Sequence, residues 1–339
     1  MAKFMIEGGK ELSGDIKVQG AKNAVLPLLA ACLLTDEDVT LKNVPDLIDV
    51  DNMLKILVDI GVSVTKGEHT VKIEASQVNS CCISPKIAKE LRSSIFMLGA
   101  VLSRKGFAKI TYPGGCDIGL RPIDIHIKAL TDLGVEVEET SGCIFCDGSN
   151  MRSGNVYLDY PSVGATENLI LSSTLLDGAT VIYNSAREPE IVDLARFLNA
   201  MGAKIKGAGS SRIVIEGVKR LHACEYSVMP DRIVAQTYML ACLCCGGEIR
   251  FVDASPIDIQ SLFYKLPKNS CIVNYKDDII SIKSKGRLKA VERISTQPYP
   301  GFPTDLQAPF MTLMCIGKGT CVLTENIFEN RFRHVPELR

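Results

Sequence analysis

Hydrophobic and polar positions recur along this chain in a fixed order: an apolar helical run, a turn, a short β-rich strand, a loop and a second helix. The helical period of the apolar runs predicts helices, and the short β-branched segments predict strands. The unit returns at a spacing of roughly 70 residues, which is typical of a repeat architecture. Its turn-and-strand element is found at residues 36–41, 106–111, 178–183, 247–251 and 319–323.

A glycine step marks the end of the second helix in the first three copies. Gly61, Gly134 and Gly202 each follow an apolar residue, at a position where a left-handed backbone would end a helix. The fourth copy has Pro267 and Asn269 there instead, so we expect its helix to end early at the proline.

Paired short strands after each helix predict the fold class. Helices of about 10 to 15 residues alternate with strand pairs such as 271–275 and 278–282, so the chain is predicted to be α/β with mixed sheets rather than a doubly wound parallel sheet. The other expected elements include a strand at 15–19 and apolar helices at 24–34, 233–245 and 306–315.

The fifth copy reaches Arg339 without a glycine step. A repeat needs its neighbour to cover its apolar face. We therefore expect residues 22–229 to form a stable unit, and residues 230–339 to be loosely ordered and sensitive to protease.

Composition indicates an ordinary globular protein. Of the 339 residues, 46% are hydrophobic and 23% are charged, and the formal net charge is −1. A balanced charge provides no field that would attract nucleic acid, and no apolar stretch approaches the roughly 18 residues of a membrane span. The first fifteen residues lack the apolar region of an export signal, so we expect a cytoplasmic protein with reduced thiols.

The thirteen cysteines raise the question of a metal site. Cys143 and Cys146 have CxxC spacing, but no second pair has the spacing of a zinc finger. Most cysteines lie in apolar runs, where cysteine behaves as a small hydrophobe. We therefore expect no metal and no cofactor.

The segment at 113–122, with the sequence PGGCDIGLRP, is the most unusual in the chain. Its glycines leave backbone amides free to hold phosphate oxygens, and Arg121 could add a bidentate contact. Cys116 beside an arginine could act as a nucleophile or proton donor. Taken alone, a glycine-rich turn with an incidental cysteine is the commoner explanation.

Charged residues also stand at the starts of predicted helices. Lys22 and Asn23 open the run at 24–34, and Arg92 opens another, which is a geometry suited to anions. A solvated lysine with an asparagine cap is the alternative. Asp305 precedes the helix at 306–315 and is expected to be its N-cap. The segment at 325–332 mixes charges and aromatics, which suits ligand contact or an ordinary surface.

Together, eight segments in chain order resemble the enolpyruvyl transferase family, and within it the branch that acts on a UDP-sugar. Any one of them is weak evidence, whereas eight at matching separations are specific. They are 20–24 (GAKNA), 92–94 (RSS), 113–116 (PGGC), 119–122 (GLRP), 161–166 (PSVGAT), 186–190 (AREPE), 303–305 (PTD) and 329–332 (ENRF).

The resemblance implies a two-domain, inside-out α/β barrel built from βαβαββ repeats, with helices inside and sheets outside. Residues 22–229 would form one complete three-unit domain. Residues 1–21 together with 230–339 would form the second, lacking its last unit. The active site would lie in the cleft between the domains.

The resemblance also implies the chemistry: transfer of the enolpyruvyl group of phosphoenolpyruvate to the 3-hydroxyl of UDP-N-acetylglucosamine, with release of phosphate, in peptidoglycan synthesis. Cys116 would protonate the phosphoenolpyruvate methylene, can form an adduct with that substrate, and would be the target of fosfomycin. Lys22 and Arg121 would hold the phosphate and carboxylate, and Asp305 would accept the hydroxyl proton. An acid and a base tuned to the working pH suit this addition.

The substrate contacts implied by the resemblance extend over both domains. They are Lys22, Asn23, Arg92, Arg121, Pro122, Ile123, Asp124, Ile125, Ser162, Val163, Asp305, Ile327 and Arg331. Tyr160 departs from the family, because some members have a lysine there near the diphosphate. The only partners implied are the two small-molecule substrates, with no nucleic acid and no membrane insertion.

Two alternatives stay open. One is an inactive truncated homologue that keeps UDP-sugar binding, and for the chain as written this predicts negligible transfer. The other is a transferase acting on 3-phosphoshikimate, which segments 113–116 and 161–164 disfavour because they resemble the UDP-sugar branch.

Overall fold

The computed structural model describes residues 3–83, 92–111, 123–140, 142–252, 254, 256–276 and 279–339. Contacts divide these residues into two compact units. The large unit contains the described residues of 20–229, and the small unit contains residues up to 19 together with those of 230–339. Each has its own hydrophobic core.

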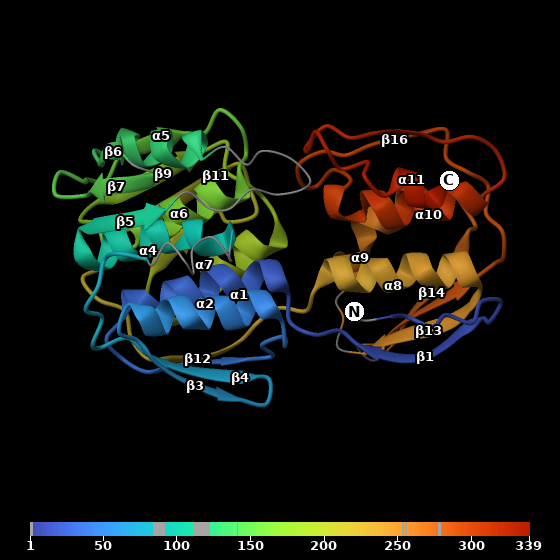
Figure 1. Cartoon of the computed structure of the whole chain (residues 1–339), viewed down its shortest axis with the longest axis horizontal. Coiled ribbons are helices and arrows are strands. Elements are labelled where there is room, and N and C mark those ends of the chain that lie inside the picture. The colour runs from blue at the N-terminus through green and yellow to red at the C-terminus, as the bar shows by residue number, and fades with distance from the viewer. Residues whose placement is uncertain are drawn as a thin grey trace. The chain divides into compact units, whose positions relative to one another are not determined.

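Three mixed sheets form the outside of the large unit (Figure 1). In two of them a central strand pairs antiparallel with a hairpin strand on one side and parallel with another strand on the other: β2 lies between β4 and β12, and β9 lies between β11 and β8. In the third, β5 pairs antiparallel with β7, and Lys109 of β5 forms a parallel bridge with Cys82. The expected mixed sheets are therefore confirmed. The sheets, in spatial order, are β12 (Cys224–Ser227), β2 (Val39–Lys42), β4 (Thr70–Glu74), β3 (Ser63–Gly67); β5 (Phe107–Thr111), β7 (Cys143–Asp147), β6 (Glu136–Thr140); and β10 (Lys204–Lys206), β11 (Arg212–Glu216), β9 (Ala179–Tyr183), β8 (Asn155–Tyr157).

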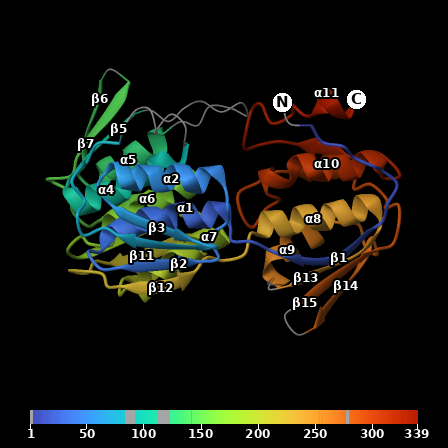
Figure 2. The ribbon, with the colours of Figure 1, turned by 60° about the horizontal axis from the view of Figure 1, so that its bottom comes forward.

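Helices fill the inside of the large unit, as Figure 2 shows. Two of them, α1 and α6, are buried around nearly their whole circumference, whereas α2 and α7 bury one face. The helical elements are α1 (Lys22–Ala31), η1 (Cys32–Leu34), α2 (Ile48–Asp59), η2 (Arg92–Ile95), α4 (Phe96–Lys105), α5 (Asp124–Asp132), α6 (Val163–Ser173) and α7 (Pro189–Ala200).

The glycine steps end their helices as expected. Gly61, Gly134 and Gly202 have φ angles of 95°, 91° and 104°, a region that other residues rarely adopt. Each turns the chain from a helix into the strands of its own sheet.

The small unit repeats the same plan around α8 (Arg232–Cys245). Its four-stranded sheet has the order β1 (Leu12–Lys17), β13 (Gly247–Val252), β15 (Ile279–Ser284), β14 (Cys271–Lys276). Strand β1 precedes the whole large unit in sequence, yet it pairs parallel with β13. The strand expected at 15–19 is therefore corrected to Leu12–Lys17, because its bounds are set by this distant partner.

The remaining elements of the small unit surround a core that contains Phe251, Phe302 and Phe310. The rings of Phe302 and Phe310 meet edge to face at 5.0 Å between centroids. The elements are α8 (Arg232–Cys245), α9 (Pro256–Phe263), β16 (Arg293–Ser295), η3 (Thr304–Leu306), α10 (Gln307–Ile316), β17 (Val322–Thr324) and α11 (Val335–Leu338).

The fourth repeat ends its helix without glycine. Helix α9 stops at Phe263, before Pro267, and Asn269 takes the left-handed conformation with φ of 66°. Asparagine tolerates that region better than most residues. The early helix end is therefore confirmed.

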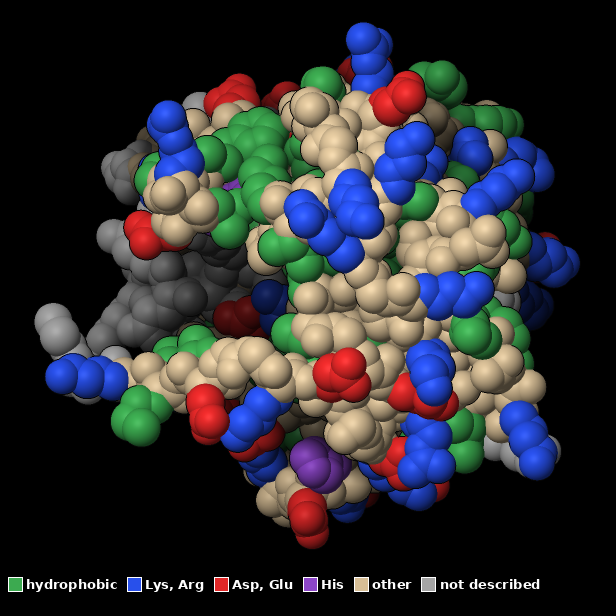
Figure 3. Space-filling view, turned by 90° about the vertical axis from the view of Figure 1, so that its right-hand side faces the viewer, with side chains coloured by type: hydrophobic (Ala, Val, Ile, Leu, Met, Phe, Trp, Pro, Cys, Tyr) green, Lys and Arg blue, Asp and Glu red, His purple; other side chains and the backbone are tan. Residues whose placement is uncertain are grey.

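The outer surface of the small unit carries many lysines and arginines (Figure 3). In the same unit, Arg287 donates hydrogen bonds to the carbonyls of Ile316 and Gly317, at 2.7 and 3.1 Å. A cation there satisfies the last carbonyls of α10 and complements the helix dipole.

Candidate functional site

In the large unit, several residues expected at a site lie at the first turns of helices. Lys22 is the first residue of α1, Asp124 of α5 and Val163 of α6, and Ser162 is the N-cap of α6. Its hydroxyl accepts a hydrogen bond from the N–H of Ala165 at 3.3 Å. Helix starts present unpaired N–H groups and a partial positive charge, so these positions suit anions.

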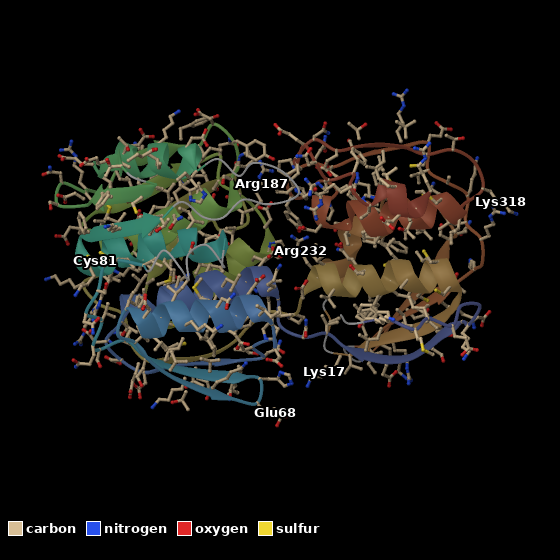
Figure 4. All side chains as sticks on the ribbon, in the orientation of Figure 1. Lys17, Glu68, Cys81, Arg187, Arg232 and Lys318 are labelled. Carbon is tan, nitrogen blue, oxygen red and sulfur yellow. The ribbon has the colours of Figure 1, made fainter. Side chains whose placement is uncertain are left out.

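Contacts between helices connect the elements that carry these residues. Lys22 Nζ lies 3.3 Å from a carboxylate oxygen of Asp49, the second residue of α2. Helix α4 packs against α1 and α6, and α5 packs against α6. Figure 4 shows Arg187 at the end of the large unit where α7 begins, opposite the end that carries Cys81. The exposed side chains of Lys22 and Asn23 leave a charged and a polar group at the tip of a buried helix.

The N-cap of α1 is Ala21, without a side-chain hydrogen bond, so Asn23 is not a cap. Ile123 is buried and Ile125 packs against the core, so both side chains hold the start of α5 in place. The side chain of Arg92 and all of Cys116, Arg121 and Pro122 lie outside the described residues.

A buried polar network at α6 was not predicted from the sequence. Asn168, one residue after Glu167, contacts the ring of His126 at 2.8 Å, and burial lowers the pKa of this histidine to about 4. The only signal in the sequence is the polar triplet Thr166, Glu167, Asn168 directly before the apolar residues 169–171.

Glu167 is fully buried, and among the described residues neither of its carboxylate oxygens has a hydrogen-bond partner. Its pKa is raised well above the ordinary value, first by burial and then by the neighbouring carboxylates of Glu190 and Glu188. Burial and the two neighbouring carboxylates therefore favour the protonated form of Glu167.

In the small unit, Asp305 is held by Arg331. The guanidinium donates a hydrogen bond to Asp305 Oδ1 at 3.0 Å, and it stacks over the ring of Phe328 at 5.4 Å. The expectation that Asp305 caps a helix is wrong, because the helix begins as the short turn η3, with Pro303 at its N-cap position and Asp305 inside. The carboxylate is instead partly exposed beside a cation.

Glu325 organises the segment that carries Ile327. One carboxylate oxygen accepts from Thr296 and from the N–H of Ile327, each at 2.8 Å, and the other accepts from Thr304 at 2.9 Å. The loop is thereby joined to the turn next to Asp305. Sequence reasoning missed Glu325, because its partners come from three separate segments.

Several of the described cysteines are poor nucleophiles because they are buried. Burial raises the pKa of Cys146 to about 12 and of Cys244 to about 11, and it raises the pKa of Cys32 further. Cys143 and Cys146 are an odd number of residues apart on β7, so their side chains leave the sheet on opposite faces and cannot share a metal.

Within the described part of the chain, no cluster of three or more His, Cys, Asp or Glu side chains is placed to bind a metal ion. No helix among those residues combines the length and apolar character that a membrane crossing requires.

The chain matches known proteins over its whole length. The family model described as EPSP synthase (3-phosphoshikimate 1-carboxyvinyltransferase) matches residues 6–339. The chain is 49% identical over 338 residues to UDP-N-acetylglucosamine 1-carboxyvinyltransferase 2 of Caldanaerobacter subterraneus subsp. tengcongensis. It is 44% identical over 342 residues to UDP-N-acetylglucosamine 1-carboxyvinyltransferase of Pseudoalteromonas atlantica. In both cases all of this chain and 81% of the relative are covered.

Solved structures share the fold. The enolpyruvyl transferase NikO from Streptomyces tendae has a TM-score of 0.88 at 21% identity, with 98% of this chain and 79% of that chain covered. An EPSP synthase from Acinetobacter baumannii has a TM-score of 0.68 at 19% identity, with 93% and 74% covered. At these identities the likeness concerns the fold.

Proposed function

The chain belongs to the EPSP synthase family of enolpyruvyl transferases, and from that premise we propose that it transfers the enolpyruvyl group of phosphoenolpyruvate to the 3-hydroxyl of UDP-N-acetylglucosamine. The observation that carries the proposal is the 49% identity, over the whole chain, to a relative named for that reaction. It is an enzyme, and its product would enter peptidoglycan synthesis.

Lys22 and Arg121 are proposed to bind phosphoenolpyruvate. This substrate is a small, highly charged anion, so several cations have to converge on it from different segments. The position of Lys22 at the start of α1 supports this role, because the helix dipole adds to its charge. Asn23, Arg92, Pro122 to Ile125, Ser162 and Val163 are proposed to contact the UDP-sugar.

Cys116 and Asp305 are proposed as acid and base. Cys116 protonates the methylene carbon while the 3-hydroxyl oxygen bonds to the neighbouring carbon, and Asp305 accepts the hydroxyl proton. Loss of phosphate together with a proton from the new methyl group then restores the double bond. The hydrogen bond from Arg331 supports this role for Asp305, because it orients the carboxylate.

Two residues of the small unit are also proposed to contact the UDP-sugar. Ile327 and Arg331 are proposed contacts, and the hydrogen bonds of Glu325 support them by fixing the loop between β17 and Arg331. In the cell, we propose a cytoplasmic enzyme inhibited by fosfomycin at Cys116, whose product supports wall synthesis and through it cell shape, the cell cycle and division.

Phosphate release from phosphoenolpyruvate tests this function. We expect release that depends on UDP-N-acetylglucosamine and is not supported by 3-phosphoshikimate. Release with 3-phosphoshikimate instead would assign the chain to the other branch. Calorimetric binding of the UDP-sugar without any phosphate release would identify an inactive homologue.

Alkylation of cysteine thiols is a second test, and it concerns the proposed acid Cys116. Because burial raises the pKa of most described cysteines, we expect brief treatment with fosfomycin or iodoacetamide to label Cys116 first, as located by mass spectrometry. Preferential labelling of Cys143 or Cys245 would contradict the proposed acid.

A further inference from the structure

The amide of Asn168 has a fixed orientation inside the large unit. Asn168 is 1% exposed, and its Oδ1 lies 2.7 Å from the backbone nitrogen of Gly99. A backbone N–H can only donate, so Oδ1 is the acceptor there and Nδ2 carries the two donors. This assignment depends on hydrogen-bond chemistry alone.

Both donors of that amide have partners. Nδ2 lies 3.0 Å from the carbonyl oxygen of Ile95 and 2.8 Å from Nδ1 of His126. A donor requires a lone pair opposite it, so Nδ1 of His126 is unprotonated. A neutral imidazole then carries its proton on Nε2.

Two glycines make room for this arrangement. A Cβ on Gly99 would lie 2.4 Å from the carbonyl oxygen of Asn168, and a Cβ on Gly164 would lie 2.8 Å from Cε1 and 3.1 Å from Nε2 of His126. The Nε2 edge of the ring therefore lies against Gly164 in the first turn of α6. Among the described residues, Nε2 has no hydrogen-bond partner.

We propose that Asn168 is a positioning residue that holds His126 as the neutral Nε2–H tautomer, so that an uncharged donor stands at the start of α6 for an anionic oxygen of the substrate. The substrate part of this inference rests on the proposed function. The tautomer itself does not.

Burial supports the neutral state. It lowers the pKa of His126 to about 4, and the opposing effect of Asp124, on the same helix, is smaller. Protonating Nδ1 would also place two donors against each other. The donor at Nε2 is therefore the same at pH values well above 4.

The first test is nitrogen NMR of the wild-type protein. The chain has four histidines, so the signals can be assigned with His126→Gln. We expect the ¹⁵N shifts of an unprotonated Nδ1 and a protonated Nε2, unchanged between about pH 5.5 and 8. A proton on Nδ1, or titration near the ordinary histidine pKa, would overturn the proposal whether or not the chain transfers enolpyruvate.

The second test is Asn168→Asp, which keeps the shape but replaces the Nδ2 donor by an acceptor. We expect the proton of His126 to move to Nδ1, and the KM for the UDP-sugar to rise about tenfold while kcat changes less than about threefold. The matched control is Asn52→Asp in α2, where Asn52 already accepts from Lys55 and KM is expected to stay unchanged.

A third variant covers the case in which Asn168→Asp does not fold. His126→Ala leaves the bonds of Asn168 to Gly99 and Ile95 in place. It removes the Nε2 donor together with the buried ring and with the acceptor that Nδ1 offers to Asn168. We expect the same rise in KM. A wild-type KM in His126→Ala would show that the donor has no role in binding, and would overturn the proposal even if the NMR tautomer is as expected.

Discussion

Helices α1 and α6 occupy matching places in two repeats of the large unit, each before the central strand of a sheet, and each is buried along its length. Their sequences differ. Residues 24–31 of α1 are all apolar, whereas α6 buries Thr166, Glu167, Asn168, Ser172 and Ser173.

This difference in sequence shows that a buried helix can serve either apolar packing or the positioning of polar groups. The body of α1 contributes apolar area, and its chemistry is confined to the exposed tip at Lys22 and Asn23. The body of α6 contains a hydrogen-bond network, in which Thr166 accepts from the N–H of Ala186 at 3.0 Å and Asn168 holds His126. Such networks position groups, but they stabilise less than packing does.

The largest expected effect is on α1. Leu29→Ala removes a fully buried side chain and is expected to lower the free energy of unfolding by about 2–5 kcal/mol. The matched change in α6, Ser172→Ala, is expected to cost less than about 1 kcal/mol, because Ser172 only bonds back to Leu169 at 3.3 Å. Urea unfolding measures both, and equal costs would remove the distinction between the helices.

Glu167→Gln is expected to stabilise the protein. In the unfolded chain Glu167 ionises near its ordinary pKa, whereas the folded state keeps it protonated to a higher pH. The contribution of protonated Glu167 to the free energy of unfolding is therefore fully present below about pH 4.5, its ordinary pKa. This contribution is lost as the pH rises from 4.5 toward the higher pKa of Glu167 in the folded protein. We expect the variant to match wild type near pH 4 and to exceed it by about 1–3 kcal/mol near pH 8.

Urea unfolding at the two pH values measures this change. Asp193 also has a pKa raised by burial, so the wild-type curve alone does not isolate Glu167, whereas the difference between variant and wild type does. A difference that does not grow with pH would show that Glu167 is ionised in the fold.

Ser162→Ala removes the side-chain cap of α6 and is expected to cost about 1 kcal/mol. Helix α1 has no equivalent, because Ala21 makes no side-chain cap. Ser162→Thr is the control and is expected to recover most of the loss in a thermal melt. A thermal midpoint for Ser162→Ala equal to that of wild type would show that the long 3.3 Å bond contributes nothing.

The smallest effect is expected at Asp49, the partner of Lys22. Both side chains are close to half exposed, so Asp49→Asn is expected to change the free energy of unfolding by less than about 0.5 kcal/mol. Addition of salt to the wild type is expected to have an equally small effect on this pair. A change above about 1 kcal/mol would assign the start of α1 a structural role.

Much of the fold follows from local patterns in the sequence. The glycine steps at Gly61, Gly134 and Gly202, the early end before Pro267 and the mixed sheets depend on residues close together in the chain, so periodicity and turn chemistry predict them. The bounds of β1 were predicted wrongly, because they depend on pairing with β13 more than two hundred residues later.

The residues of the candidate site also fall into two groups, those that the local sequence predicts and those that depend on distant segments. That Lys22 opens a helix was predictable, because an apolar run begins directly after it. The pairing of Asp305 with Arg331 was not, and neither were the partners of Glu325 and Asn168, because each joins segments that only the folded chain brings together.

The central claim is that chemistry depends on the tips of these helices and stability on their bodies. Phosphate release and urea unfolding, measured on one preparation of Lys22→Ala, test it most directly. We predict that UDP-sugar-dependent phosphate release falls at least about 100-fold, while the free energy of unfolding changes by less than about 1 kcal/mol, because the side chain is half exposed. Phosphate release within tenfold of wild type, or a loss of stability comparable to that of Leu29→Ala, would contradict the claim.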